Sequence, residues 1–388
     1  MIYLDNNATT RVDPRVLDAM LPYFSERFGN PSSRHEAGNA AADAVLRARR
    51  QVRALLGAAH ESEVVFTSGG SEADATAILS AARARPERRA IVISAVEHAA
   101  VLAVARDLEA EGYAVREIPV DGEGRLDVTA FRAAVSSDVA VASVMWANNE
   151  TGAVFPVAEL AEIARAAGVP FHTDAVQAAG KVPLDLAATA IDMLSLSGHK
   201  LHAPKGIGAL YLRRGTRFRP LLRGGHQERG RRAGTENVPA IVALGAAADL
   251  ARRTLAADSG AVARLRDRLE AGLLRRVPGC RVLAAGAPRL SNTSAVVFPG
   301  VEGEALLAFL DRAGVAASGG AACSAGAMTA SHVPLAMGLN AAEARGMVRF
   351  SLSRETTADE IDRAVEAVAD CVSRLRGGGA ARRAVACV

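Results

Sequence analysis

The sequence contains few cysteines, few aromatic residues and very little lysine. Its 388 residues include 4 cysteines, at positions 280, 323, 371 and 387, and no pair of them has a CxxC spacing. So few cysteines exclude a disulfide framework, and their spacing favours no structural zinc site. We therefore expect the protein to work in a reducing compartment.

Long apolar runs are also missing. No window approaches the roughly 18 uninterrupted apolar residues that indicate a membrane-spanning helix. The segment MIYLDNNATT, at positions 1–10, has no basic region followed by an apolar one, as a secretory signal would. These absences predict a cytoplasmic protein without a membrane partner.

A strong charge of one sign is absent as well. The formal net charge is +4, and arginines are scattered among acidic residues except in the stretch RRGTRFRPLLRGGHQERGRR at positions 213–232. This stretch lacks the regularly interleaved aromatic side chains that stack on nucleic-acid bases. We interpret it as a solvated loop or an anion-handling surface, and we expect no nucleic-acid partner.

The order of the apolar segments predicts an α/β fold with more than one domain. The chain exceeds the usual size of a single hydrophobic core. Short apolar runs alternate with Ala-rich helical segments, as in a mostly parallel sheet that helices cover. The candidate strands are Glu63 to Thr67, Ala90 to Ser94, Val139 to Met145, Pro170 to Thr173, Met193 to Leu196 and Ile207 to Leu212, and the helices between them include Ser71 to Arg85, His98 to Glu111 and Val157 to Ala167.

The pattern changes after about residue 240. A long helix from Pro239 to Arg276 is followed by strand-like segments at Ser294 to Phe298 and Val348 to Leu352, and then by a helix from Ala358 to Leu375. We expect a large domain at residues 21–250 and a smaller α+β domain at 251–388, joined by residues 1–20. The Gly-rich tail after Arg376 is predicted to be loose.

Polar residues that follow the candidate strands are the first place to seek a site, because ligands of open α/β sheets lie beyond the carboxyl ends of the strands. The segment TSGGSE at 67–72 offers backbone N–H groups and the Ser71 hydroxyl to a phosphate at a helix start. A plain turn capped by serine explains the same residues equally well. It matches neither the P-loop nor the GxGxxG pattern.

Three further side chains follow strands in the same way. Asp174 could keep a pyridinium nitrogen protonated, or could act as a helix N-cap. Lys200 could form a Schiff base, and only two other lysines, Lys181 and Lys205, occur in the chain. His98 could stack on a cofactor ring or move protons, although a capping or surface role is the more ordinary use of such a histidine taken alone.

Along the chain the order is a candidate phosphate turn, then His98, Asp174 and Lys200. With this order the sequence resembles the class V aminotransferase family of fold-type I pyridoxal-phosphate (PLP) enzymes, and more closely its NifS-type cysteine desulfurases. The resemblance extends over nearly the whole chain and implies a seven-stranded sheet in the large domain. It is carried by YLDNNATT at 3–10, FGNPSSRH at 28–35, WANNETGAVFP at 146–156, FHTDAVQAAGK at 171–181, SGHKLHAPKG at 197–206, RGGHQERGRRAGTEN at 223–237, SHVPLAMG at 331–338 and VRFSLSR at 348–354.

The resemblance also implies a role for each matching residue. Lys200 would hold PLP as a Schiff base, Asp174 would pair with the pyridine nitrogen, Gln177 with the ring hydroxyl, and His98 would stack on the ring. Asn149 and Arg349 would bind the carboxylate of the substrate, L-cysteine, and Asn149 would also contact the cofactor. Phosphate contacts would come from Gly70, Ser71, Ser197, Gly198 and His199, and Thr235 would reach the phosphate of a neighbouring subunit, which makes a homodimer the working unit.

Cys323 is the candidate sulfur acceptor. It lies in SGGAACSAG, within the segment 318–332, where glycines and small side chains predict a loop that moves a thiol into and out of a pocket. The resemblance implies that Cys323 receives sulfur as a persulfide and passes it to an acceptor scaffold protein for iron–sulfur cluster assembly, with a possible use in nitrogen fixation. Cys323 is also the one candidate metal ligand, for a transferred iron–sulfur cluster.

Other functions fit parts of this pattern. A selenocysteine lyase or another class V PLP enzyme would keep Lys200 and Asp174. From another class, an inactive sulfur-carrier scaffold would keep the fold without the chemistry. Cys280 and Cys371 lie in apolar or helical settings and are expected to be buried structural residues.

Overall fold

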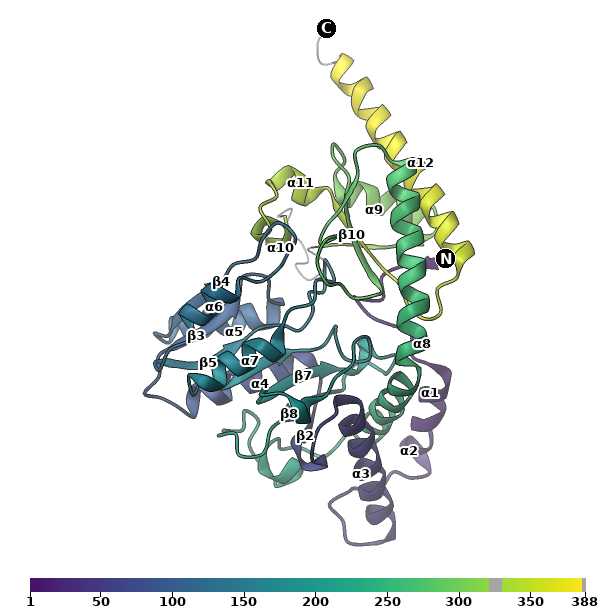
Figure 1. Cartoon of the computed structure of the whole chain (residues 1–388). Coiled ribbons are helices and arrows are strands. Elements are labelled where there is room, and N and C mark those ends of the chain that lie inside the picture. Colours follow the sequence, from purple (N-terminus) through teal and green to yellow (C-terminus); the bar gives the residue numbers. More distant parts are fainter. Residues whose placement is uncertain (321–329, 386–388) are drawn as a thin grey trace.

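The core of the molecule is a seven-stranded, mostly parallel sheet (Figure 1). The described residues of this computed structural model are 1–320 and 330–385. The strand order is β2-β8-β7-β6-β5-β3-β4, and only β8 runs against its neighbours. The bounds are β2 (Val64–Thr67), β3 (Ala90–Ser94), β4 (Ala114–Ile118), β5 (Val139–Ser143), β6 (Phe171–Asp174), β7 (Met193–Ser197) and β8 (Gly208–Leu212). The predicted α/β fold with seven strands is confirmed.

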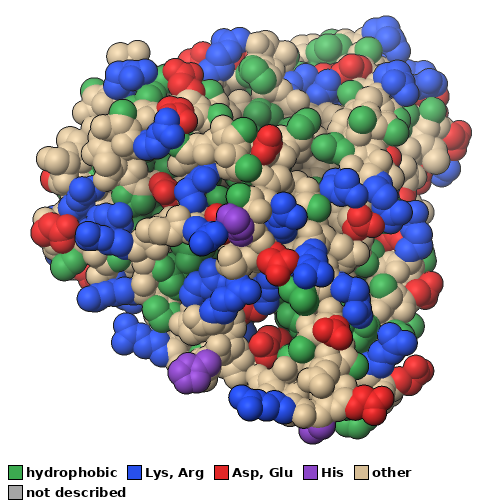
Figure 2. Space-filling model, turned by 60° about the horizontal axis from the view of Figure 1, so that its bottom comes forward, with side chains coloured by type: hydrophobic (Ala, Val, Ile, Leu, Met, Phe, Trp, Pro, Cys, Tyr) green, Lys and Arg blue, Asp and Glu red, His purple; other side chains and the backbone are tan. Residues whose placement is uncertain are grey.

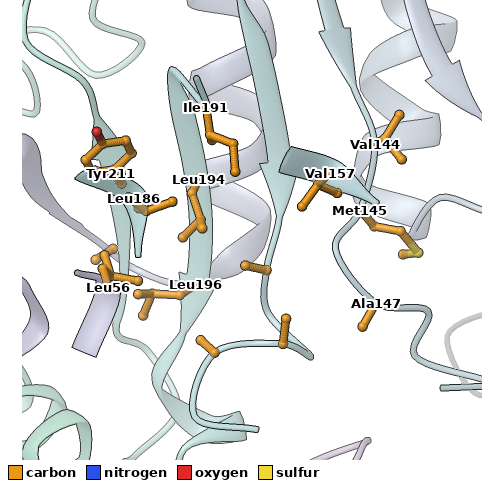
Figure 3. Packing of buried hydrophobic residues seen from close by; sticks show 14 of the residues in the cluster. Leu56, Val144, Met145, Ala147, Val157, Leu186, Ile191, Leu194, Leu196 and Tyr211 are labelled. Atoms are coloured by element: carbon orange, nitrogen blue, oxygen red, sulfur yellow. The ribbon is translucent and has the colours of Figure 1, made fainter. Parts of the chain in front are cut away.

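Helices cover both faces of this sheet, as the alternation of buried side chains along its strands requires. On β3, Ile91 and Ile93 join a cluster with α4 (Gly70–Arg83) and α5 (Ala99–Ala110). Ala90 and Val92 face the opposite cluster, part of which is drawn in Figure 3. The elements on that second side are α3 (Glu36–Leu56), α6 (Val128–Ala134), α7 (Val157–Ala166) and the first part of α8 (Val238–Arg276).

A second, smaller sheet is formed by strands that follow the long helix α8 in the chain. It is antiparallel, with the order β12-β13-β10-β9. Its strands are β9 (Arg281–Val282), β10 (Thr293–Val297), β12 (Ser318–Gly319) and β13 (Met347–Ser351). The helices in this part of the chain are α9 (Gly303–Arg312), α10 (His332–Ala336), α11 (Ala341–Arg345) and α12 (Ala358–Val385). Since α12 continues to Val385, the prediction of a loose tail after Arg376 was wrong.

The N-terminal segment contacts both parts of the molecule. β1 (Ile2–Tyr3) pairs in parallel with β11 (Val315–Ala316), beside the small sheet. The next elements, α1 (Pro14–Met20) and α2 (Pro22–Ser25), pack against α8. The domain limits at residues 20 and 250 stay a prediction.

No helix in the described ranges has both the length and the apolar character needed to span a bilayer.

Candidate active site

The predicted cofactor residues lie at the same edge of the large sheet. The strands β2, β3, β5, β6 and β7 run in one direction, so their carboxyl ends meet along this edge. Asp174 is the last residue of its strand, and Gly70, His98, Asn149 and Lys200 follow theirs within a few residues. This is where an open α/β sheet binds its ligands.

Asp174 ends β6 and is almost fully buried, with 5% of its surface exposed. One carboxylate oxygen accepts the backbone N–H of Val176 at 2.8 Å, so the capping contact considered from the sequence is present. Burial raises the pKa of Asp174, while the positive charges of His98 and Lys200 oppose that rise. A buried carboxylate flanked by these cations is suited to pair with a protonated ring nitrogen.

Lys200 ends a short 3-10 turn, Gly198–Lys200, that follows β7. Its ammonium donates to the backbone carbonyls of Asn7 and Ala8 at 2.5 and 2.6 Å. The N-terminal segment thus holds the amine over the carboxyl end of the sheet, in the electrostatic range of Asp174.

His98 is the N-cap of α5, and its Nδ1 atom accepts the backbone N–H of Ala100 at 3.1 Å. This bond fixes the imidazole ring and leaves Nε2 as the atom directed away from the helix. The capping role and a place beside the cofactor are therefore compatible.

The start of α4 forms a close-packed turn that suits a phosphate. A Cβ atom on Gly70 would lie 2.8 Å from Val176 Cγ2, so a larger residue here would require the Val176 side chain to shift. Ser71 is exposed at the helix start, and Ser197 ends β7 opposite Gly70. Gly69, not Ser71, is the N-cap, and no side chain caps this helix, so its first N–H groups are available to an anion.

His199 follows Ser197 and Gly198 and lies in the short 3-10 turn after β7. Its Nδ1 atom is 3.2 Å from the hydroxyl of Thr9. Burial, followed by the charges of Lys200, Lys205 and Lys181, lowers the pKa of His199 to about 4. These surroundings favour the neutral form of the ring at pH 7.

Arg349 projects from β13 and is 3% exposed. One guanidinium nitrogen donates to the backbone carbonyl of Asn149 at 3.0 Å, and another donates to Asp5 at 2.8 Å. Its Nε atom is buried and has no hydrogen-bond partner among the described residues. The guanidinium is thus paired with Asp5 and Asn149 but, within the described part of the chain, keeps one free N–H group, at Nε, for a further acceptor such as a carboxylate.

Asn7 connects three of the site residues, Gln177, Lys200 and Asn149, and sequence reasoning missed its role. Its backbone oxygen accepts from both Gln177 and Lys200, at 2.9 and 2.5 Å. Its side-chain nitrogen donates to the Asn149 carbonyl and to Thr293, and its side-chain oxygen accepts from Asn292 at 3.0 Å. The signal was its place in the block YLDNNATT, but nothing in that block indicates these distant partners.

Lys181 is a second residue whose position was not predicted. Its ammonium donates to Gln177 at 2.7 Å, and it lines a cavity of about 70 Å³ together with Lys200, His202 and Arg354. Burial, then the charges of Lys200 and Arg349, lowers the pKa of Lys181 to about 7. Its presence among the three lysines of the chain was the available signal.

Close to Asp174 in the chain, His172 belongs to a buried network of polar side chains that the sequence did not reveal. His172, two residues earlier on β6, contacts the hydroxyls of Ser143 and Ser195 at 2.8 and 2.9 Å. Asp74 of α4 approaches the same imidazole at 3.6 Å. Burial lowers the pKa of His172 to about 3, so the ring is neutral. Burial first, then the charge of Asp174, raises the pKa of Asp74.

One predicted residue among those that the structure describes, Thr235, is not brought into this cluster. Thr235 is exposed in the segment before α8 and shares no hydrogen bond with the residues above in the described part of the chain. Cys323 lies outside the described residues, as does most of the predicted loop. Cys280 and Cys371 are buried, as expected for structural cysteines.

Comparisons with known sequences agree with this geometry. A cysteine desulfurase of Cereibacter sphaeroides is 60% identical over 376 residues, which cover 97% of this chain and 96% of that protein. The cysteine desulfurase NifS of Azotobacter vinelandii is 56% identical over 375 residues, with 97% and 93% covered.

Solved structures give the same result at lower identity. A NifS-like protein superposes with a TM-score of 0.90 at 35% identity, over 96% of this chain and 99% of that one. A structure described as SspA in complex with cysteine has a TM-score of 0.81 at 35% identity, over 92% and 100%. The family model described as aminotransferase class-V matches residues 2–364. The chain therefore belongs to the aminotransferase class-V family, as its motifs predicted.

Proposed function

We propose that this protein is a PLP-dependent cysteine desulfurase that converts L-cysteine to L-alanine and collects the sulfur on Cys323. The convergence of Lys200, Asp174 and His98 at one sheet edge carries this proposal, together with the 60% identity to a cysteine desulfurase. The alternatives of a carrier without chemistry and of another class V enzyme share the fold, so they are separated by experiment below.

The residues at the sheet edge fit PLP. Gly70, Ser71, Ser197 and Gly198 would hold its phosphate at the start of α4, with His199 beside them. Asp174 would face the ring nitrogen, Gln177 the ring hydroxyl, and His98 the ring face. When bound, PLP supplies an electron sink that stabilises negative charge on the substrate.

The protein side chains then bind and orient L-cysteine and move its protons. Arg349 and Asn149 bind the carboxylate, since the Arg349 guanidinium is buried with an unsatisfied Nε atom. Lys200 would be the base that takes the proton from Cα. His98, fixed through Nδ1, holds or returns a proton through Nε2.

The sulfur transfer requires a thiolate, which we assign to Cys323 by the resemblance. Its sulfur attacks the sulfur of the substrate, the substrate Cβ–S bond breaks, and a protein S–S bond forms. The electrons of the broken bond remain with Cβ, which takes a proton to become the methyl group of alanine. The net change converts L-cysteine and a thiol into L-alanine and a persulfide, so no external oxidant is needed.

We further infer a homodimer as the working unit, an acceptor scaffold protein for the persulfide, and a cytoplasmic location. Iron–sulfur cluster assembly is the proposed use of the sulfur. A role in nitrogen fixation is supported by the 56% identity to the NifS protein of Azotobacter vinelandii.

Incubation of the purified holoenzyme with L-cysteine tests the proposal. Alanine and, with a thiol reductant, sulfide should form in equal amounts. Cys323→Ala should abolish sulfide release from cysteine, whereas Cys280→Ala, which alters a buried cysteine, should not. Unchanged release by Cys323→Ala would indicate a lyase or another class V enzyme, and no alanine from wild-type protein would indicate a carrier.

A further inference from the structure

A buried ion pair anchors the segment at residues 223–237, which connects the region after β8 to α8. Glu228 is 6% exposed, and its two carboxylate oxygens accept from the two terminal nitrogens of Arg49 on α3, each at 2.7 Å. Arg49 also lies over the ring of Phe66, 4.7 Å from its centroid. The mechanism proposed above uses neither member of this pair.

The pair also completes the edge of the large sheet. β2 is the edge strand, and its other side is bonded to β8. On the open side, Arg49 donates to the Val64 carbonyl at 2.6 Å and Glu228 accepts the N–H of Phe66 at 3.3 Å. The side-chain pair therefore takes the place of a further strand, which ties the segment to a rigid element.

The backbone at this anchor is held in an uncommon conformation. Glu228 and the next residue, Arg229, both have left-handed backbone angles, with φ of 49° and 59°. Residues with a Cβ atom adopt this region rarely, and two in succession persist only where surrounding contacts impose them. The bidentate ion pair supplies such contacts, so it determines how the chain continues toward Thr235.

Beyond the anchor, the segment is tied down again before it reaches Thr235. Arg232 forms two hydrogen bonds with Glu72, at 2.9 and 3.2 Å, beside the predicted phosphate turn. Thr235 itself is exposed. Figure 2 shows the face at the lower end of Figure 1, to which β2 and α3 belong, with basic and acidic side chains interspersed.

Hydrogen bonding next to Thr235 is incomplete within one chain. Among the described residues, Arg231 Nη2 and Glu236 Oε2 are buried without a partner. Both residues line a hollow of about 480 Å³ together with Ser32, Arg49 and His226. Unsatisfied polar groups on both sides of an exposed threonine are expected where a second molecule completes the surface.

We propose that Glu228, held by Arg49, is a positioning residue that presents Thr235 to the cofactor phosphate of the neighbouring subunit. This inference rests on the proposed function and its homodimer. It makes a distinctive prediction: substitution of Glu228 damages the site of the partner subunit and leaves the site of its own subunit intact.

Mixed dimers test this directly. Subunits with Glu228→Gln and subunits with Lys200→Ala, carrying different tags, are co-expressed, and the heterodimer is purified. Its one lysine-bearing site receives Thr235 from the subunit with the intact anchor. We expect the Glu228→Gln homodimer to bind PLP at least about tenfold more weakly. The buried Arg49 loses its carboxylate partner in this variant, so the pair no longer positions Thr235. The heterodimer should recover one wild-type-affinity site and about half of the wild-type alanine production.

Thr235→Val with Lys200→Ala is the matched pair that reports trans action of Thr235 itself. If this pair is rescued and the Glu228→Gln pair is not, Glu228 acts within its own subunit and the inference fails. If neither pair is rescued although wild-type protein produces alanine, the contribution of Thr235 in trans is wrong, and the inference fails with it. Absence of alanine from wild-type protein would instead contradict the proposed function.

A milder variant protects the test against poor folding. Arg49→Lys keeps the charge but removes one of the two parallel bonds. It should weaken PLP binding less than Glu228→Gln does and should show the same rescue in mixed dimers. Glu61→Gln, which alters an exposed ion pair with the adjacent Arg50, is the control and should leave PLP affinity unchanged. Equal affinity of wild type, Arg49→Lys and Glu228→Gln for PLP would contradict the inference.

Discussion

The ammonium of Lys181 lies 2.7 Å from the side-chain oxygen of Gln177, whose amide nitrogen donates to the backbone of Asn7. This contact fixes which end of the Gln177 amide faces the site. We predict that Lys181→Met weakens PLP binding by roughly fivefold, the cost of about one hydrogen bond. Titration of the cofactor-free protein with PLP measures the affinity. Lys205→Met, at an exposed lysine, is the control, and equal affinities of the two variants would contradict this role.

A second prediction concerns Glu97, the buried residue before His98. Its Oε1 atom accepts from Ser94 and from the N–H of Met145, at 2.6 and 2.8 Å. Burial raises the pKa of Glu97 from 4.5 to about 8. Between these two values the folded protein keeps a proton that the unfolded chain has lost, so the free energy of unfolding falls as the pH rises through this window.

Glu97→Gln cannot lose this proton, so its stability should depend less on pH. Relative to wild type, it should gain on the order of a few kcal/mol between about pH 5 and about pH 8. Urea denaturation at the two pH values measures the difference. The exposed-pair variant Glu61→Gln should follow wild type, and the same pH dependence in Glu97→Gln would show that Glu97 is ionised in the folded state.

Arg349 offers a third prediction, about the substrate. Arg349→Lys keeps a positive charge but cannot form the two-pronged bond to a carboxylate. We expect KM for L-cysteine to rise by about tenfold to a hundredfold, with a smaller change in kcat. Steady-state alanine production measures both constants. Arg345→Lys, at a surface ion pair with Glu302, should change neither, and an unchanged KM in Arg349→Lys would place the carboxylate elsewhere.

Asn7 should be important for stability. Its side chain bonds to Asn149, Thr293 and Asn292 within the buried contact between the N-terminal segment and the sheets. Asn7→Ala removes one buried hydrogen bond from each of these three groups and should lower the free energy of unfolding by about 2 to 4 kcal/mol. Urea denaturation of this variant and of Asn39→Ala, at an exposed position on α3, makes the comparison. A loss equal to that of Asn39→Ala would refute the role of Asn7.

Most of the fold could be predicted from the sequence because local patterns determine it. The strand Ala90–Ser94 was predicted with its observed bounds, and five other strands of the large sheet were predicted to within one or two residues. β4 was missed because it is an edge strand with Arg116 and Glu117 in its middle, so it lacks a buried apolar run.

The candidate site was predictable only in part. Asp174, Lys200 and His98 could be identified because each directly follows a strand whose apolar run is visible in the sequence. Asp74 and Asn7 could not be, since their importance comes from contacts with residues far along the chain. The Arg49–Glu228 pair, whose members are 179 positions apart in the sequence, is of the same kind.

The scarcity of lysine makes one measurement decisive. Borohydride reduction of the holoenzyme fixes the cofactor to the amine that holds it, and peptide mapping by mass spectrometry then locates it. The site described here predicts a phosphopyridoxyl group on Lys200 and none on Lys181 or Lys205. A label on either of those lysines, or no label on any of the three, would contradict the account.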